Sequence, residues 1–193
     1  MNADYLYRVQ HDLSSSKHYA GIGIISTLSQ EKYTQNSSVD LESIPGALED
    51  RVMLNYLKKH IDWNNKDPTP YVSATTSIEW ALYHAALLKG NGLQNVHILV
   101  IRARKCTSPW WCAKEKLETE KERRLYNFAR TASEVIIESF IPKRAIIKRW
   151  DTIIDYLPSL GRDVKVSFVA WTADQALNKE YRAILAWSEA RLE

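Results

Sequence analysis

Several stretches of the chain alternate apolar and polar residues in the two-residue period of a β-strand. In the first, residues 5–10, the side chains of Tyr5, Tyr7 and Val9 fall on one face, so Arg8 belongs to the other face. Alternation or a short apolar run predicts further strands at 71–73, 96–102, 134–140, 145–150 and 164–171. The run at 96–102 is apolar almost throughout, which predicts a central position in a sheet.

Other stretches repeat their apolar residues every three or four positions, as amphipathic helices do. This spacing predicts helices at 45–60, 77–89, 114–124 and 173–192. At the start of the second helix, Thr76 and Glu79 fit a capping box, in which each side chain accepts a hydrogen bond from the amide of the other residue. Gly90 and Gly92 predict its end. The segment 114–124 is dense in both charges and is typical of a solvated helix.

The order of these elements indicates the fold class. Helices concentrate in the first half and short strands in the second, which favours an α+β fold with a mainly antiparallel or mixed sheet. The chain has 193 residues, with no internal repeat and no linker-like stretch. We therefore expect a single domain that spans residues 1–193.

Composition excludes several classes of protein. With 45% hydrophobic and 25% charged residues, the chain is neither collagen-like, nor disordered, nor a coiled coil. Its apolar runs are far shorter than the roughly 20 residues of a membrane-spanning helix, and its N-terminal segment lacks the pattern of a signal peptide. We expect a cytoplasmic protein without a membrane partner. Cys106 and Cys112 are expected to be free thiols, because no second Cys or His pair follows at the spacing of metal ligands.

Charge and aromatic residues leave the partners open. The net charge is only +3, which does not by itself imply nucleic acid. The densest basic cluster consists of Lys143, Arg144, Lys148 and Arg149, and we interpret it as a solvated face rather than a phosphate-binding surface. The adjacent Trp110 and Trp111 are better explained as anchors of a long loop than as a recognition loop.

The common catalytic motifs are missing from the sequence. It contains no complete dinucleotide fingerprint, no phosphate-binding loop and no metal-binding His-Glu-x-x-His. Ser73 is not part of a Gly-x-Ser-x-Gly elbow. We therefore expect neither Rossmann-type nor zinc-dependent chemistry, and no hydrolase triad.

Three separated segments carry a different pattern. They are Leu-Tyr-Arg at 6–8, Tyr-Val-Ser-Ala-Thr-Thr-Ser at 71–77, and Ser-Glu-Val-Ile-Ile at 133–137, the last followed by Ile-Pro at 141–142 and Ala-Ile-Ile at 145–147. In order and approximate spacing they resemble the Arg, Ser-Thr-Ser and Glu motifs of cholera-toxin-like mono-ADP-ribosyltransferases. The segment His-Ile-Asp-Trp-Asn-Asn at 60–65 is also similar to an uncharacterised fungal domain family that shares the early Leu-Tyr-Arg.

The resemblance implies a fold, a substrate and a set of site residues. The fold would be a split antiparallel or mixed β-sheet with flanking helices, and the substrate would be NAD, whose ADP-ribose is transferred to a macromolecular acceptor. Glu134 would be the catalytic carboxylate, assisted by Arg8 and Ser73. Arg8 would hold the phosphates and Ser73 would bond Glu134 or the nicotinamide ribose. Thr75 would support the bend after the strand, and Tyr71 would stack near nicotinamide.

These residue types suit that chemistry. Breaking the bond between nicotinamide and ribose generates an oxocarbenium-like cation, which a positioned carboxylate such as Glu134 stabilises. Arg8 supplies a permanent cation with planar donors for phosphate oxygens. His11 and His60 lie near these motifs only in sequence, so we leave both out of the expected site.

One position departs from the pattern of the resembled family. Many relatives carry Glu or Gln two residues before the catalytic Glu, where it engages the acceptor, but this chain has Ala132 there. Glu138 lies on the same strand face as Glu134, yet about 13 Å away, and does not replace it. The acceptor therefore stays open, and water, as in an NAD glycohydrolase, is one alternative.

A second hypothesis belongs to a different class. The chain would be a catalytically inactive interaction module that keeps the fold and binds protein or nucleic acid through its Trp pair or its basic strand. Arg8, Ser73 and Glu134 occur in the order of the motifs, which a scaffold alone does not require. The sequence therefore favours the enzyme.

Overall fold

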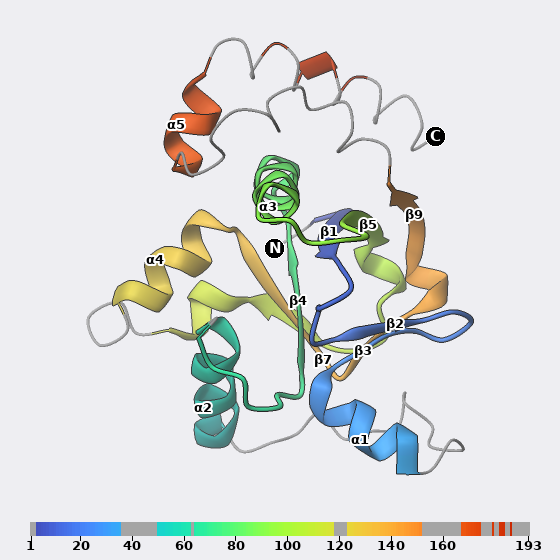
Figure 1. The fold of residues 1–193 in the computed structure, drawn as a ribbon. Coiled ribbons are helices and arrows are strands. Elements are labelled where there is room, and N and C mark those ends of the chain that lie inside the picture. Colours follow the sequence, from blue (N-terminus) through green and yellow to red (C-terminus); the bar gives the residue numbers. More distant parts are fainter. Residues whose placement is uncertain are drawn as a thin grey trace.

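The computed structural model describes residues 3–35, 50–62, 64–117, 123–151 and 167–174, and the single positions 179, 182, 183 and 186. These residues form two antiparallel sheets with helices around them, which confirms the α+β class (Figure 1). Within the described residues, no helix is long and apolar enough to cross a membrane.

The larger sheet has six strands in the order β6-β7-β4-β1-β5-β9. Their bounds are β1 Tyr5–Gln10, β4 Tyr71–Thr75, β5 His97–Arg102, β6 Trp110–Cys112, β7 Glu134–Glu138 and β9 Ile146–Trp150. The smaller sheet has the order β2-β3-β8, with bounds Lys17–Tyr19, Gly23–Ile25 and Phe140–Pro142. The apolar strand β5 lies inside the larger sheet, between β1 and β9, as its composition predicts.

Helices surround the sheets. Their bounds are α1 Thr27–Gln35, α2 Asp50–Ile61, α3 Ile78–Gly90, α4 Arg123–Thr131 and α5 Phe168–Ala173. The described part of the chain also contains the short 3₁₀ turns η2 Ala103–Lys105, η3 Ala113–Lys116 and η4 Lys143–Ala145. In Figure 1, α3 lies between the larger sheet and α5, while α2 and α4 lie together on another side.

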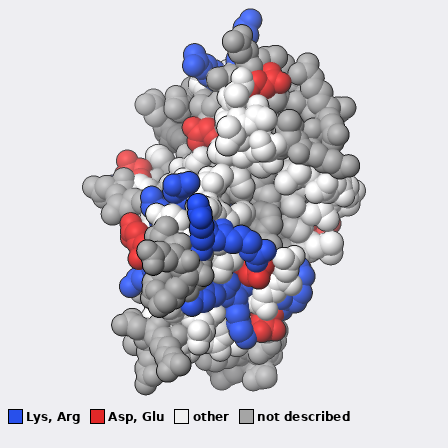
Figure 2. Space-filling model, turned by 90° about the vertical axis from the view of Figure 1, so that its left-hand side faces the viewer, with Lys and Arg blue, Asp and Glu red and all other residues white. Residues whose placement is uncertain are grey.

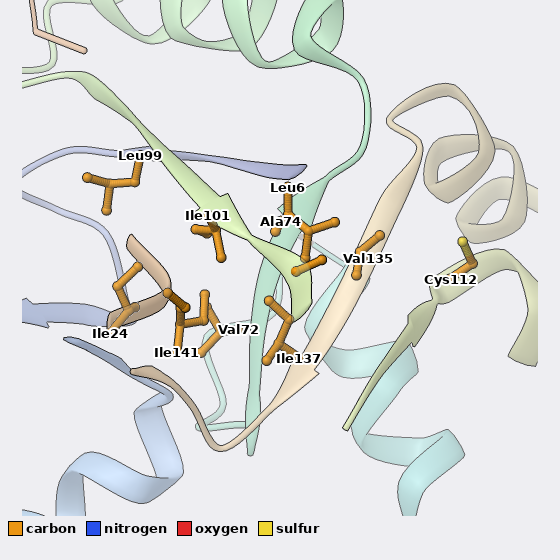
Figure 3. Close-up of a cluster of buried hydrophobic side chains, with 12 residues drawn as sticks. Leu6, Ile24, Val72, Ala74, Leu99, Ile101, Cys112, Val135, Ile137 and Ile141 are labelled. Atoms are coloured by element: carbon orange, nitrogen blue, oxygen red, sulfur yellow. The ribbon is translucent and has the colours of Figure 1, made fainter. Parts of the chain in front are cut away.

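The apolar core fills the space between the two sheets. Leu6, Val72 and Leu99 of the larger sheet are fully buried against Ile24 and Ile141 of the smaller one (Figure 3). A second cluster packs α3 and α5 on the opposite face of the larger sheet, and a third joins α2 and α4 to β7. Because both faces of the larger sheet are covered, its strands are held rigidly under any site they carry.

The larger sheet is split between β1 and β4. These two strands share a single register pair, Tyr7 with Thr75, whereas β1 is paired with β5 along all six of its residues. Beyond Tyr7 the two strands separate, so that residues 8–10 do not pair with residues 72–74, which would continue this register. The gap leaves backbone groups and side chains of both strands available to a ligand.

Helix α3 begins one residue later than its sequence predicts. Ser77, not Thr76, is the N-cap, and the Ser77 hydroxyl accepts from the amide of Trp80 at 3.0 Å. The amide of Thr76 instead donates to the carbonyl of Ser133 at 3.2 Å. Tertiary pairing with the segment before β7 therefore displaces the expected capping box.

Three other predictions change. The strand expected at 134–140 is divided at Ser139, whose φ of +57° turns the chain from β7 into β8 of the other sheet. The strand expected at 164–171 is wrong in its described part, which forms α5, because Ser167 caps a helix and Phe168 and Trp171 both pack on α3. The helix expected at 114–124 is interrupted, with η3 at its start and α4 beginning only at Arg123. Residues 45–49, 164–166 and most of 173–192 lie outside the described residues.

Gly23 is required where β3 approaches β8 closely in the smaller sheet. Its φ is +132°, and a Cβ built there would collide with the carbonyl oxygen of Ile141 on β8. We expect Gly23→Ala to lower the free energy of unfolding by about 3 kcal/mol, because strain and overpacking add. Gly21→Ala is the matched control, since Gly21 has a φ of +96° but open space around its Cα, and about 1 kcal/mol is expected there. Equal losses in urea unfolding would contradict this assignment.

Candidate active site

A cleft of about 440 Å³ opens at the split in the larger sheet. Its walls come from β1 and the loop after it, from β4, from the first residue of β7 and from the segment that connects α2 to β4. One stripe of α3, formed by Trp80, His84 and Leu88, lines it as well. These three residues recur every four positions, so the helix turns a single face to the cleft.

Arg8 bridges the gap between the separated strands. Its side chain is 8% exposed, and its Nη1 donates to the carbonyl of Ser73 at 2.6 Å. Its Nε donates to Oε1 of Gln10 at 2.9 Å, and Gln10 in turn donates to the carbonyl of Ser16. Burial lowers the pKa of Arg8 to about 10, while the charge of Glu134 opposes that shift, so the guanidinium stays charged at neutral pH.

Glu134 lies at the start of β7, directly opposite Thr75 of β4. Its Oε1 accepts a hydrogen bond of 2.6 Å from the hydroxyl of Ser73, and its Oε2 is buried without a protein partner. Burial raises the pKa of Glu134 to about 7, against the hydrogen bond from Ser73 and the charge of Arg8. The carboxylate therefore has one oxygen fixed and one free to act on a ligand.

His60 completes a chain of hydrogen bonds to this carboxylate. Its Nε2 lies 2.8 Å from the hydroxyl of Ser73, and its Nδ1 lies 2.6 Å from the hydroxyl of Thr69. Because Ser73 gives its proton to Glu134, the Nε2–H of His60 donates to Ser73 and its Nδ1 accepts from Thr69. Burial and the charge of Arg8 lower the pKa of His60 to about 3, which keeps the ring neutral.

Thr75 fixes the turn that presents Glu134. Its hydroxyl donates to the carbonyl of Ala132 at 2.6 Å and accepts from the amide of Ser77 at 2.9 Å. Ser133, which lies between Ala132 and Glu134, has a φ of +46°, a conformation that turns the chain sharply into β7. Thr75 thus acts on the backbone around the site, in the supporting position that the sequence suggests.

The structure brings Arg8, Ser73, Thr75 and Glu134 together around the cleft but places Tyr71 elsewhere. Tyr71 is 1% exposed and does not line the cleft, because its ring packs edge-on against His60 and Trp111. Its hydroxyl donates to the carbonyl of Met53 in α2. Tyr71 therefore packs behind His60, outside the cleft, and is not positioned to stack on a ligand there.

His11, His60 and His84 all line the cleft, and none of them was expected there from the sequence. His60 lies 13 residues before Ser73 and reaches it only because the loop after α2 returns along β4. His84 lies on the mainly apolar helix α3, and its place in the Trp80–Leu88 stripe could have been found from the four-residue spacing. The aromatic side of the cleft is extended by Phe128 of α4, which packs edge-on against Trp80.

The other residues singled out from the sequence lie outside the cleft or offer it no polar group. Trp110 is half-buried in β6, and Trp111 packs on Tyr71, so both anchor the edge of the sheet. Ala132 is buried and offers no polar side chain to the cleft. Within the described residues, Cys106 and Cys112 form no disulfide. Among the described residues, no group of three His, Cys, Asp or Glu side chains could hold a metal ion.

Basic and acidic side chains are mixed around the rim of the cleft. The side of the molecule that carries α2 and α4 displays Lys and Arg interspersed with Asp and Glu (Figure 2). Lys59 pairs with Asp67 at 2.7 Å, and Arg124 pairs with Asp62 at 3.1 Å. These exposed pairs contribute little to stability, and they leave Glu134 as the acidic group at the centre of the cleft.

The raised pKa of Glu134 predicts a specific dependence of stability on pH. Between its ordinary pKa and about 7, the folded chain holds a proton that the unfolded chain has lost, so the charged carboxylate destabilises the fold as pH rises. Glu134→Gln removes this penalty. We expect the variant to match the natural chain at pH 4, below the ordinary pKa, and to exceed it by about 3 kcal/mol at pH 8, measured by urea unfolding. A variant that is less stable at pH 8 would contradict the raised pKa.

Comparison with known proteins shows a family but no function. The model of a family described as "Domain of unknown function (DUF7587)" matches residues 1–154, a range that contains every residue of the cleft and excludes α5. No curated protein matches the sequence. Because the match covers well over half of its length, the chain belongs to the DUF7587 family.

Proposed function

We propose that the chain is an NAD-dependent mono-ADP-ribosyltransferase that cleaves the nicotinamide–ribose bond in this cleft. The observation that carries the proposal is the meeting of Arg8, Ser73 and Glu134 from three adjacent strands, with one carboxylate oxygen of Glu134 buried and unpartnered. The core of the fold is then the split sheet of the ADP-ribosyltransferases, and the gap between β1 and β4 is its substrate cleft.

Glu134 is the catalytic residue of this reaction. The bond from the nicotinamide nitrogen to the ribose C1′ breaks, the electron pair leaves with nicotinamide, and positive charge develops on the ribose. Oε2 of Glu134 accepts a hydrogen bond from a ribose hydroxyl and stabilises that charge. Such a fixed charge acts strongly because the carboxylate is only 5% exposed.

Ser73 and His60 hold this carboxylate in place. The hydrogen bonds from Thr69 to His60, from His60 to Ser73 and from Ser73 to Glu134 leave the catalytic oxygen one orientation. Arg8 binds the diphosphate of NAD with the donors that its bonds to Ser73 and Gln10 do not use.

After nicotinamide departs, the acceptor forms a bond to C1′ of the ribose. The acceptor then loses its proton to solvent. Ala132 offers no side chain to orient a guanidinium or a base, which is compatible with a macromolecular acceptor recognised elsewhere or with water. The cytoplasmic location expected from the sequence stays a prediction.

Removal of the Glu134 charge tests the proposal. We expect Glu134→Gln to reduce release of nicotinamide from NAD by at least about 100-fold, because the amide cannot compensate the developing cation. Glu138→Gln is the matched control, since Glu138 is buried on the same strand but does not line the cleft, and it should retain the activity. Release is measured by chromatography with and without a cell lysate as the source of acceptor. Equal release by both variants, or none by the natural chain in either condition, would refute the proposal.

The pKa of Glu134 also predicts the pH profile of the reaction. The carboxylate must be ionised to stabilise the cation, so kcat/KM should fall about tenfold per pH unit below pH 7 and level off above it. His60 does not contribute in this range because its pKa is far lower. Steady-state rates between pH 5 and 9 give the profile, and a flat profile would contradict the assigned role.

A further inference from the structure

Around Arg8 the cleft is lined by several side chains that can donate hydrogen bonds or carry positive charge, beside the apolar Val9, Leu13 and Leu88. His11 follows β1, Ser14 to Ser16 form the turn after it, and His84 faces them from α3. Neither histidine belongs to the chain of hydrogen bonds that holds Glu134. The acidic residue nearest in sequence, Asp12, does not line the cleft, since both its carboxylate oxygens accept from Asn95 at 2.8 Å.

The orientation of each group can be followed from its contacts. The amide of Leu13 donates to Nδ1 of His11 at 3.2 Å, which leaves the proton of the neutral ring on Nε2, free to donate. The Oγ of Ser14 accepts from the amide of His11, so its hydroxyl proton remains available. His84 is held by a tilted ring contact with Trp80.

Burial and the charges of Arg8 and of nearby basic groups lower the pKa values of His11 and His84. The pKa of His84 is lowered to about 4 by burial, by His11 and by Arg8. Burial, Arg8 and Lys17 lower the pKa of His11, against a smaller raising effect of Asp12. Groups arranged in this way are stabilised by an anion placed between them.

We propose that His11, His84 and the Ser14–Ser16 turn form, together with Arg8, the seat for the diphosphate of a dinucleotide ligand. This inference rests on the proposed function, and it identifies the part of the ligand that the Arg8 half of the cleft recognises. The seat holds the ligand while Glu134, which lines the same cleft, faces the ribose that reacts. Arg8 thereby connects the recognition of phosphate to the placement of the sugar.

Binding of ADP-ribose tests the seat, because this probe carries the diphosphate but no nicotinamide bond to cleave. By calorimetry we expect His84→Asn to bind ADP-ribose about tenfold more weakly and Ser15→Ala about threefold more weakly, as expected for lost hydrogen bonds to a charged group. His18→Asn is the matched control, since His18 lies on exposed β2 outside the cleft and should bind as the natural chain does. Adenosine, which lacks phosphate, should show no comparable loss in any variant.

The outcomes separate this inference from the proposed function. Ser15 is exposed, and among the described residues its hydroxyl has no hydrogen-bond partner, so its variant answers the question even where His84→Asn lowers the melting temperature. Unchanged binding of ADP-ribose by both cleft variants, or no binding by the natural chain, overturns the seat. Binding with the expected losses but no release of nicotinamide from NAD supports the seat and refutes the transferase.

Discussion

The structure depends on a buried cation placed where two strands come apart. Arg8 occupies the gap between β1 and β4, and its hydrogen bond to the carbonyl of Ser73 replaces the ladder bonds that the split removes. A cation in such a place is costly unless it is paired and hydrogen-bonded, and Gln10, Ser73 and Glu134 provide that compensation. Arg8 therefore both holds the split strands together and forms part of the candidate site in the cleft.

The pKa of the Glu134 carboxylate, which faces this cation, is set by opposing effects. Burial favours its neutral form, while Arg8 and Ser73 favour the charged form, and the outcome is a pKa close to neutrality. The neutral ring of His60 adds orientation without adding charge, because its pKa is too low for protonation. A site assembled from such opposing influences is sensitive to any ligand that changes the local charge.

Much of this arrangement could be predicted from the sequence, for identifiable reasons. The alternation around Arg8, the apolar strand β5 and the helix that ends at Gly90 were all predicted correctly, because local patterns determine them. The grouping of Arg8, Ser73 and Glu134 is what the resemblance to the ADP-ribosyltransferase motifs implies, and the structure brings the three residues to one cleft. The sequence does not predict His60 in the cleft, because only the return of the chain after α2 brings its ring to Ser73. The position of His84 follows the four-residue spacing of α3, but this spacing alone does not show which face of the helix meets a cleft. The segment 168–171 alternates as a strand does, yet it forms α5 because Phe168 and Trp171 pack on α3. Tyr71 was misplaced in the cleft, since its burial against Trp111 depends on an edge strand distant in sequence.

Helix α5 has a consequence for how the domain is delimited. The family match ends at residue 154, yet Phe168 and Trp171 cover the rings of Trp80 and Tyr83, with centroids 5.1 to 5.7 Å apart. A chain cut at the end of the match would expose these rings to water, and the resulting apolar surface would lie on α3, the helix whose Trp80, His84 and Leu88 line the cleft. The smallest piece suited to expression and crystallisation therefore extends at least through Asp174, twenty residues past the conserved unit.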